Sequence, residues 1–171
     1  SNIESKVVEA RFFKLNNDRK VVYKHPYNTQ YTAGGKKGLV DLIRGGKDFR
    51  TGRWQGFQYH DLEITVELDS TEIVSYISSG YIQDIKSWIW MPQEVSYSYS
   101  TDGENFSPIT TISNKIPIDK YGSIITDFSQ KINPVKARYI GLKAKQLGKI
   151  PEWHLGKGDE SFIFIDEIII Q

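Results

Sequence analysis

The residues of this chain best suited to chemistry are two pairs of neighbouring aromatic and polar side chains. Trp153 precedes His154, Arg53 precedes Trp54, and Arg50 lies three residues before Arg53. An aromatic ring can pack on the apolar face of a pyranose while nearby polar groups bond its hydroxyls. The pairs therefore suit a sugar site in which both tryptophans are platforms and the arginines and His154 bond hydroxyls. Alternatively, each tryptophan anchors its own loop in the core.

Two carboxylates suggest a cation site. Asp41 lies in a glycine-rich segment, and Glu167 lies late in an otherwise apolar C-terminal segment. An ionised carboxylate on a buried strand is costly unless it is paired or bound to a metal. Calcium prefers carboxylate and carbonyl oxygens, which a glycine-rich loop can direct inward. The alternatives are exposure of Glu167 at a strand end, or a salt bridge to Arg44, Arg50 or Arg53.

No set of residues predicts catalysis. The three histidines, His25, His60 and His154, have no metal-binding spacing, and there is no nucleophile elbow. Glycosidases need two carboxylates across a cleft. Asp166 and Glu167 are adjacent, so on a regular strand they should point to opposite faces. We therefore expect a chain that is not itself an enzyme.

Composition narrows the class of protein. The chain has 171 residues, which suits one domain over 1–171, and 13% of them are aromatic. A net charge of +1 gives no electrostatic case for nucleic acid. The chain has no cysteine, so it has neither disulfides nor a cysteine zinc site. No apolar run approaches the roughly 20 residues that span a bilayer, so we expect no membrane insertion.

The elements that must position these residues are strands. Alternating apolar residues predict strands over 62–68, 95–99 and 138–144, and an apolar run predicts a central strand over 161–170. Weaker candidates are Val7–Leu15, Ile73–Ser79, Phe106–Ile112 and Gly122–Phe128, with at most a helical turn at Gly38–Arg44. This pattern favours an all-β, eight-stranded antiparallel jelly-roll sandwich. Its core should include Leu62, Ile64, Val66, Leu68, Ile140, Leu142, Ile163 and Ile165.

Two stretches interrupt the alternation. Tyr31–Gln58 is rich in glycine, and Leu147–Glu160 is similarly irregular. Long loops in a compact domain are usually functional or disordered, and the tryptophans here favour packed loops. These stretches contain every candidate sugar-binding residue, so we expect any sugar to bind there.

Three segments resemble a known family. They are "YTAGGKKGLVDLIRGGKDFRTGRWQGFQYHDLEITVELDS", "GYIQDIKSWIWMPQEVSYSYSTDGENF" and "IPEWHLGKGDESFIFIDEIII". Together they resemble discoidin (coagulation factor type C) domains, which include the family 32 carbohydrate-binding modules. The most similar version is the C-terminal module of bacterial family 20 β-N-acetylhexosaminidases, or chitobiases. The motifs "FRTGRWQGFQ" and "PEWH" are more specific than "STDG".

The resemblance implies a jelly roll with a structural calcium. Asp41 matches the family's calcium-binding aspartate, Thr51 its threonine and Glu167 its final glutamate, while Gly38 would offer a carbonyl. Leu42 departs from the pattern, because it stands where the family usually has glycine. A side chain there restricts the backbone angle φ.

The resemblance also implies a role. We expect a non-catalytic module of an extracytoplasmic hexosaminidase that holds the enzyme near glycans ending in a hexose or N-acetylhexosamine. The alternative is a structural module that packs on the catalytic domain of the parent chain and binds no sugar.

Overall fold

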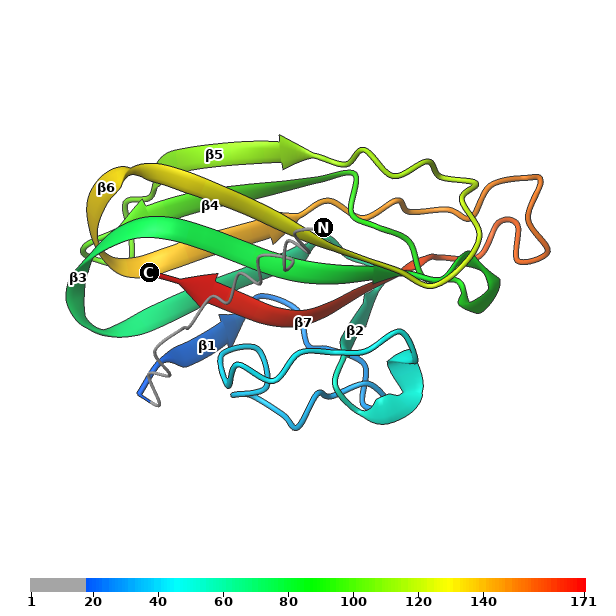
Figure 1. Ribbon diagram of the computed structural model, residues 1–171, viewed down its shortest axis with the longest axis horizontal. Helices are drawn as coiled ribbons and strands as arrows, with labels where there is room; N and C mark the ends of the chain where they lie inside the picture. Colours follow the sequence, from blue (N-terminus) through cyan, green and yellow to red (C-terminus); the bar gives the residue numbers. More distant parts are fainter. Residues whose placement is uncertain (1–17) are drawn as a thin grey trace, which may run out of the picture.

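The computed structural model describes residues 18–171, which form seven strands and two short 3₁₀ helices (Figure 1). The strands are β1 (Lys20–Tyr23), β2 (Gln55–Gln58), β3 (Leu62–Gln83), β4 (Glu94–Ser100), β5 (Ser107–Ser113), β6 (Ile124–Ala144) and β7 (Phe162–Ile170). The helices are η1 (Phe49–Thr51) and η2 (Ile85–Ser87). All strand pairs are antiparallel. None of the helices in this part of the chain is long and apolar enough to cross a membrane.

Two long strands, β3 and β6, run through both layers of the sandwich (Figure 1). The first half of β3 pairs with β1 and with the second half of β6, which also pairs with β4. The second half of β3 pairs with the first half of β6 and with β7. Register shifts in β3 lie between Glu67 and Glu72 and between Val74 and Tyr76. One sheet thus folds into a first layer, β1-β3-β6-β4-β5, and a second layer, β6-β3-β7-β2.

The predicted fold class, an antiparallel jelly roll, is confirmed, but the strand boundaries differ. The predicted strands 62–68 and 73–79 are one bent strand, and so are 122–128 and 138–144. The four-residue strands β1 and β2 were not predicted, because they are too short to show alternation. The segment Gly38–Arg44, for which the sequence allowed at most a turn or two of helix, has no helix. The weak candidate Val7–Leu15 lies outside the described residues.

The core follows the predicted alternation. All eight residues predicted for it are buried: Leu62, Ile64, Val66, Leu68, Ile140, Leu142, Ile163 and Ile165. The final strand is central, because β7 lies between β2 and β3. Its other face buries Phe164 in a second cluster with Trp54, Ile82 and Ile89. Burial on both faces explains its continuous apolar run.

A β-bulge places the two acidic residues of β7 on one face. Ile165 pairs with Tyr81 and Ile168 with Ser79, so Asp166 and Glu167 together face Gly80. Ile165 and Ile168 both belong to the main core, which leaves both carboxylates on the opposite side of the strand. The prediction that they point to opposite faces is wrong, because it assumed a regular strand.

Gly80 provides the space for a partly buried ion cluster, in which Asp166 is buried and Arg44 and Asp127 are partly exposed. Arg44 donates from Nε to Asp166 Oδ2 at 2.7 Å and from Nη2 to Asp127, and the backbone N–H of Gly45 bonds the same Asp166 oxygen at 2.9 Å. Burial raises the pKa of Asp166, and the Arg44 guanidinium opposes that shift. A Cβ at Gly80 would overlap the Asp166 carboxylate and the Arg44 guanidinium.

Gly80→Ala should therefore destabilise the protein. We expect the free energy of unfolding to fall by about 1–3 kcal/mol, since overpacking forces buried groups to move. Gly46→Ala is the control, because a Cβ there meets nothing within 4 Å. Urea denaturation measures both, and equal stabilities for the two variants would contradict this packing.

Candidate functional site

Irregular loops gather at one end of the sandwich, beyond the start of β7 (Figure 1). Hydrogen bonds tie them together: Trp90 Nε1 donates to the carbonyl of Ile118 at 2.9 Å, and Gln83 Nε2 donates to the carbonyls of Pro117 and Lys120. Trp90 also packs with Ile150 in a small apolar cluster. These loops are therefore braced against each other. The tryptophans of these stretches favoured packed loops of this kind.

Trp153 lies on the surface of the 147–160 loop, with 50% of its side chain exposed. Its neighbour His154 is buried, with its ring 5.2 Å from that of Trp90 and 5.7 Å from that of Trp153. His154 Nδ1 accepts the backbone N–H of Gly156 at 3.1 Å. Trp153 is thus available to stack on a ligand. His154 braces the loop rather than offering the accessible hydroxyl partner that was predicted.

Trp54 is not a platform, contrary to the sequence prediction. Its side chain is 0% exposed and packs on Ile82, Ile89 and Phe164. Its Nε1 donates to the carbonyl of Gly46 at 3.0 Å, which satisfies the indole inside the protein. Gly45 lies against the indole, where a Cβ would overlap it. Trp54 therefore anchors the glycine-rich loop, which was the alternative considered from the sequence.

Arg50 and Arg53 are exposed, but they do not join Trp153. Arg50 forms a two-bond ion pair with Asp48, at 2.8 and 3.0 Å. These hydrogen bonds lower the pKa of Asp48. A hollow of about 290 Å³ next to Arg50 is lined by Gln30, Tyr31, Phe49, Gly52 and Trp54. Trp153 is not part of this hollow, so the predicted residues divide between two surfaces.

Glu167 is a buried carboxylate that no side chain pairs with in the part of the chain the structure describes. It is 1% exposed, and no side chain bonds it within the described residues; the backbone N–H groups of Leu42 and Ile168 lower its pKa without making well-formed hydrogen bonds to either oxygen. Burial, together with the negative charge of Asp41, raises the pKa of Glu167 to about 8. The loop carrying Asp41 runs beside β7, because the N–H of Ile168 donates to the carbonyl of Leu39 at 2.7 Å. The structure therefore brings together the two predicted carboxylates.

The other predicted ligands are placed differently. Gly38 is buried in the same loop, immediately before Leu39. Leu42 adopts a φ of 61°, a left-handed conformation that costs a side-chain-bearing residue about 1 kcal/mol or more. The turn after Asp41 thus forms even without the family's glycine. Thr51 is exposed, and its hydroxyl donates to the carbonyl of Asp48 rather than reaching Glu167.

None of the three arginine alternatives pairs with Glu167. Arg44 bonds Asp166 and Asp127, and Arg50 bonds Asp48. The salt bridges of residues 18–171 include none to Glu167 from any arginine. Burial lowers the pKa of Arg19, and the negative charges of Glu72 and Glu167 oppose that shift. Arg19 makes no salt bridge to Glu167, and its Nη2 donates to the carbonyl of Ile170 at 2.9 Å.

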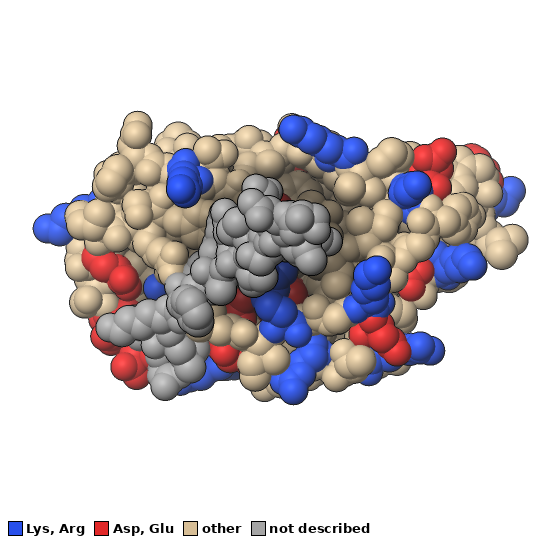
Figure 2. Space-filling model, viewed as in Figure 1, with Lys and Arg blue, Asp and Glu red and all other residues tan. Residues whose placement is uncertain are grey.

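The donors near Glu167 suit a hard cation. Within residues 18–171, no three histidine or acidic side chains converge on one point, which rules out a carboxylate cage in that part of the chain. An ion at Asp41 and Glu167 would need backbone carbonyls for its remaining ligands. Calcium accepts such a mixture, whereas zinc prefers nitrogen and sulfur. On the face in Figure 2, basic and acidic side chains lie interspersed.

Comparisons with known proteins identify the fold. No protein-family model matches the sequence, and no curated protein matches it. Among solved structures, CpGH89CBM32-5 from Clostridium perfringens, in complex with GalNAc-β-1,3-galactose, has a TM-score of 0.55 and 18% identity, covering 90% of this chain and 93% of that one. Chitosan-binding module 1 of a Paenibacillus sp. IK-5 chitosanase/glucanase has a TM-score of 0.56 and 11% identity, covering 90% and 95%.

A third example is CBM32-3 from a family 31 glycoside hydrolase of Clostridium perfringens, with a TM-score of 0.54, 15% identity and 89% coverage of both chains. The chain has the CBM32 fold. Identities this low establish the fold alone, so the discoidin resemblance is confirmed at that level. The link to family 20 hexosaminidases stays a prediction.

The two tryptophans predicted as platforms should behave differently in this CBM32 fold. Trp54→Ala should lower the free energy of unfolding by about 3–5 kcal/mol, because it leaves a large cavity. Trp153→Ala should change it by less than about 1 kcal/mol, since half of that side chain is already in water. Denaturant titration measures both. Equal losses would show that Trp153 also braces the core.

Proposed function

We propose that this chain is a non-catalytic carbohydrate-binding module of a secreted or periplasmic glycosidase, with a chitobiase-type β-N-acetylhexosaminidase as its parent. The observation that carries the proposal is Trp153, a half-exposed aromatic ring on a loop that buried His154 and Trp90 hold in place. The fold shared with sugar-binding modules supports it, as do the "PEWH" and "FRTGRWQGFQ" resemblances. The ligand would be a glycan with a terminal hexose or N-acetylhexosamine.

Such a module would act by proximity. A single stacking residue on an exposed loop recovers little free energy beyond the cost of ordering the ligand, so binding to one sugar unit would be weak. Tethering the catalytic domain to a glycan-rich surface would still raise the effective substrate concentration. The module needs no catalytic residue for this role.

A second candidate function is structural. Leu155 is fully exposed next to half-exposed Trp153. Neighbouring exposed apolar side chains are typical of surfaces that another domain covers. In this alternative, the 147–160 loop packs on the catalytic domain of the parent chain and binds no sugar.

Trp153→Ala should weaken glycan binding at least tenfold, because the ring supplies the stacking surface. Tyr121→Ala is the matched control, since Tyr121 is also an exposed aromatic residue on a loop. Calorimetric titration with N-acetylhexosamine-terminated oligosaccharides, chosen from a glycan array, measures both variants. Unchanged binding by the folded Trp153 variant would remove this loop from the site, and no binding by the native chain would favour the structural alternative.

We also propose a structural calcium ion held by Asp41 and Glu167 with backbone carbonyls of the loop at residues 38–42. The support is the buried Glu167 carboxylate, which no cationic side chain among residues 18–171 neutralises and which lies beside a second carboxylate. The ion would neutralise both groups and fix the glycine-rich loop against β7. It would take no part in chemistry.

The stability of the calcium-free protein should depend on pH. Burial and Asp41 raise the pKa of Glu167 to about 8, whereas glutamate in an unfolded chain titrates near 4.3. Between these two pKa values the Glu167 carboxyl is protonated in the folded state and ionised in the unfolded chain. The free energy of unfolding should therefore fall as the pH rises from about 5 to 8, by at most about 1.4 kcal/mol per pH unit.

Calcium should reverse this loss at pH 8, because it binds the folded state alone. Glu167→Gln should remove both the pH slope and the response to calcium. Glu152→Gln is the control, since that carboxylate is exposed. Thermal unfolding in calcium and in EDTA, across this pH range, measures all three proteins. Identical melting temperatures in calcium and EDTA at pH 8 would contradict the site.

A further inference from the structure

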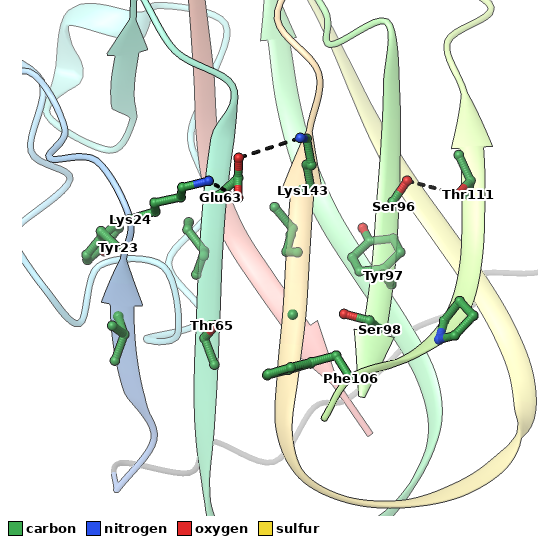
Figure 3. Close-up of a pocket in the computed structure, with 15 residues that line it drawn as sticks. Tyr23, Lys24, Glu63, Thr65, Ser96, Tyr97, Ser98, Phe106, Thr111 and Lys143 are labelled. Atoms are coloured by element: carbon green, nitrogen blue, oxygen red, sulfur yellow. Dashed lines mark hydrogen bonds and ion pairs between the residues drawn. The ribbon is translucent and has the colours of Figure 1, made fainter. Parts of the chain in front are cut away.

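A groove of about 640 Å³ crosses the outer face of the first layer (Figure 3), and none of its lining residues belongs to the 147–160 loop. Its walls come from strands β1, β3, β6, β4 and β5, whose outward side chains alternate with the core residues. This volume lies within the range of pockets that hold small ligands, about 300–1,000 Å³. The polar residues that line it include Lys24, Glu63, Thr65, Ser96, Ser98 and Lys143.

A glycine in the floor of this groove lets the Phe106 ring lie close to the sheet. Gly141 lies in the second half of β6, opposite Ser98 of β4 and Thr65 of β3. A Cβ at this position would overlap the Ser98 hydroxyl and touch the Phe106 ring at 3.4 Å. Glycine inside a strand weakens it and often marks a close approach to the backbone, and here the Ser98 hydroxyl and the Phe106 ring make that approach.

One exposed aromatic ring lies across the groove. Figure 3 shows Phe106 extending over β6, between Ser98 on one side and Thr65 on the other. Phe106 is 38% exposed. This ring and Val22, which is 58% exposed, therefore present apolar surface among the polar side chains of the groove.

The turn that carries Phe106 is rigidly built. Asp102 Oδ1 accepts the backbone N–H groups of Glu104 and Asn105, and its Oδ2 accepts from the Asn105 side chain at 2.8 Å. Ser100 Oγ accepts the N–H groups of Asp102 and Gly103. The hydrogen bonds that the Asp102 carboxylate accepts, first that of the Asn105 side chain and then those of the Asn105 and Glu104 N–H groups, hold the pKa of Asp102 well below its usual range. A ring presented on a fixed turn loses little entropy when a ligand binds.

Free hydroxyls flank the ring, and charges close one end of the groove. The hydroxyls of Ser98 and Thr65 make no hydrogen bond within the described residues, whereas Ser96 and Thr111 bond each other at 2.9 Å. At the end drawn uppermost in Figure 3, Glu63 lies between Lys24 at 2.9 Å and Lys143 at 3.5 Å. Lys24 and Lys143 lower the pKa of Glu63, so it is ionised at neutral pH.

We propose that this groove is a second glycan-binding surface, which takes a neutral, linear oligosaccharide of two or more sugar units. One sugar would stack on Phe106, the Ser98 and Thr65 hydroxyls would bond it, and the Lys24–Glu63–Lys143 group would bond the hydroxyls of the next unit. The inference rests on the proposed glycan-binding function but assigns it a different surface. A protein partner fits less well, because charged and hydroxyl side chains are interspersed with the apolar ones along the lining, whereas the core of a protein interface is depleted of charge.

The experiment is a nuclear magnetic resonance titration of the ¹⁵N-labelled chain with chitotetraose and cellotetraose. We expect amide shifts at residues 65, 98, 106 and 141, in addition to any at 147–160. Phe106→Ala should weaken the groove response at least tenfold, and Thr65→Trp, which fills the groove, should abolish it. Trp153→Ala and Tyr121→Ala should leave it unchanged. A thermal unfolding scan checks that each variant is folded.

The outcomes separate the two proposals. Shifts confined to 147–160 would overturn the groove assignment and leave the proposed function standing. Shifts in the groove that Phe106→Ala and Thr65→Trp do not alter would also overturn it. A response to tetragalacturonate alone would contradict the neutral ligand class. If neither surface responds to any oligosaccharide, both the groove assignment and the glycan-binding function fail.

Discussion

The burial of β7 on both faces is the constraint on which the rest of this structure depends. A strand between β2 and β3 with apolar residues on each side holds the two clusters of the core together. Two carboxylates interrupt that strand, and a bulge opposite Gly80 turns both of them away from the main core. One oxygen of Asp166 is then bonded by Arg44 and the N–H of Gly45, while no side chain within the described residues pairs with Glu167. The glycine-rich loop supplies Arg44 and Gly45 to Asp166 and brings Asp41 beside Glu167. These contacts determine its position against β7.

The same loop shows why an aromatic residue in an irregular stretch is ambiguous. Trp54 and Trp153 both sit in loops beside a basic or imidazole side chain, yet one is buried and the other half exposed. Trp54 fills the space under the glycine-rich loop, where Gly45 lies against its indole. Trp153 belongs to a loop whose apolar contacts Ile150 and Trp90 already supply, so its own ring remains at the surface. A stacking surface thus arises where neighbouring residues have completed the packing.

Two surfaces of the molecule combine fixed backbone with exposed aromatic side chains, and they differ in construction. The 147–160 loop presents Trp153 at one end of the sandwich, held by the buried ring of His154. The groove presents Phe106 over the middle of a sheet, held by the hydrogen bonds of the Asp102 turn. Both fixed arrangements reduce the conformational entropy that the protein loses when a ligand binds. That loss is one of the costs that weak binding must offset. Two sites on one module would also raise avidity for a chain long enough to reach both.

The sequence by itself determined the fold class and the core, because period-two alternation reports directly which face of a strand is buried. It also marked Asp41 and Glu167 as a pair, through the cost of a carboxylate in an apolar strand. Tertiary structure alone decided that β3 and β6 each run through both layers, since a bend at a bulge leaves no mark in local alternation. It alone placed Asp166 and Glu167 on one face, buried Trp54 and His154, and separated Arg50 from Trp153. The groove with Phe106 and Gly141 was equally hidden, because it joins residues from five strands that only the fold brings side by side.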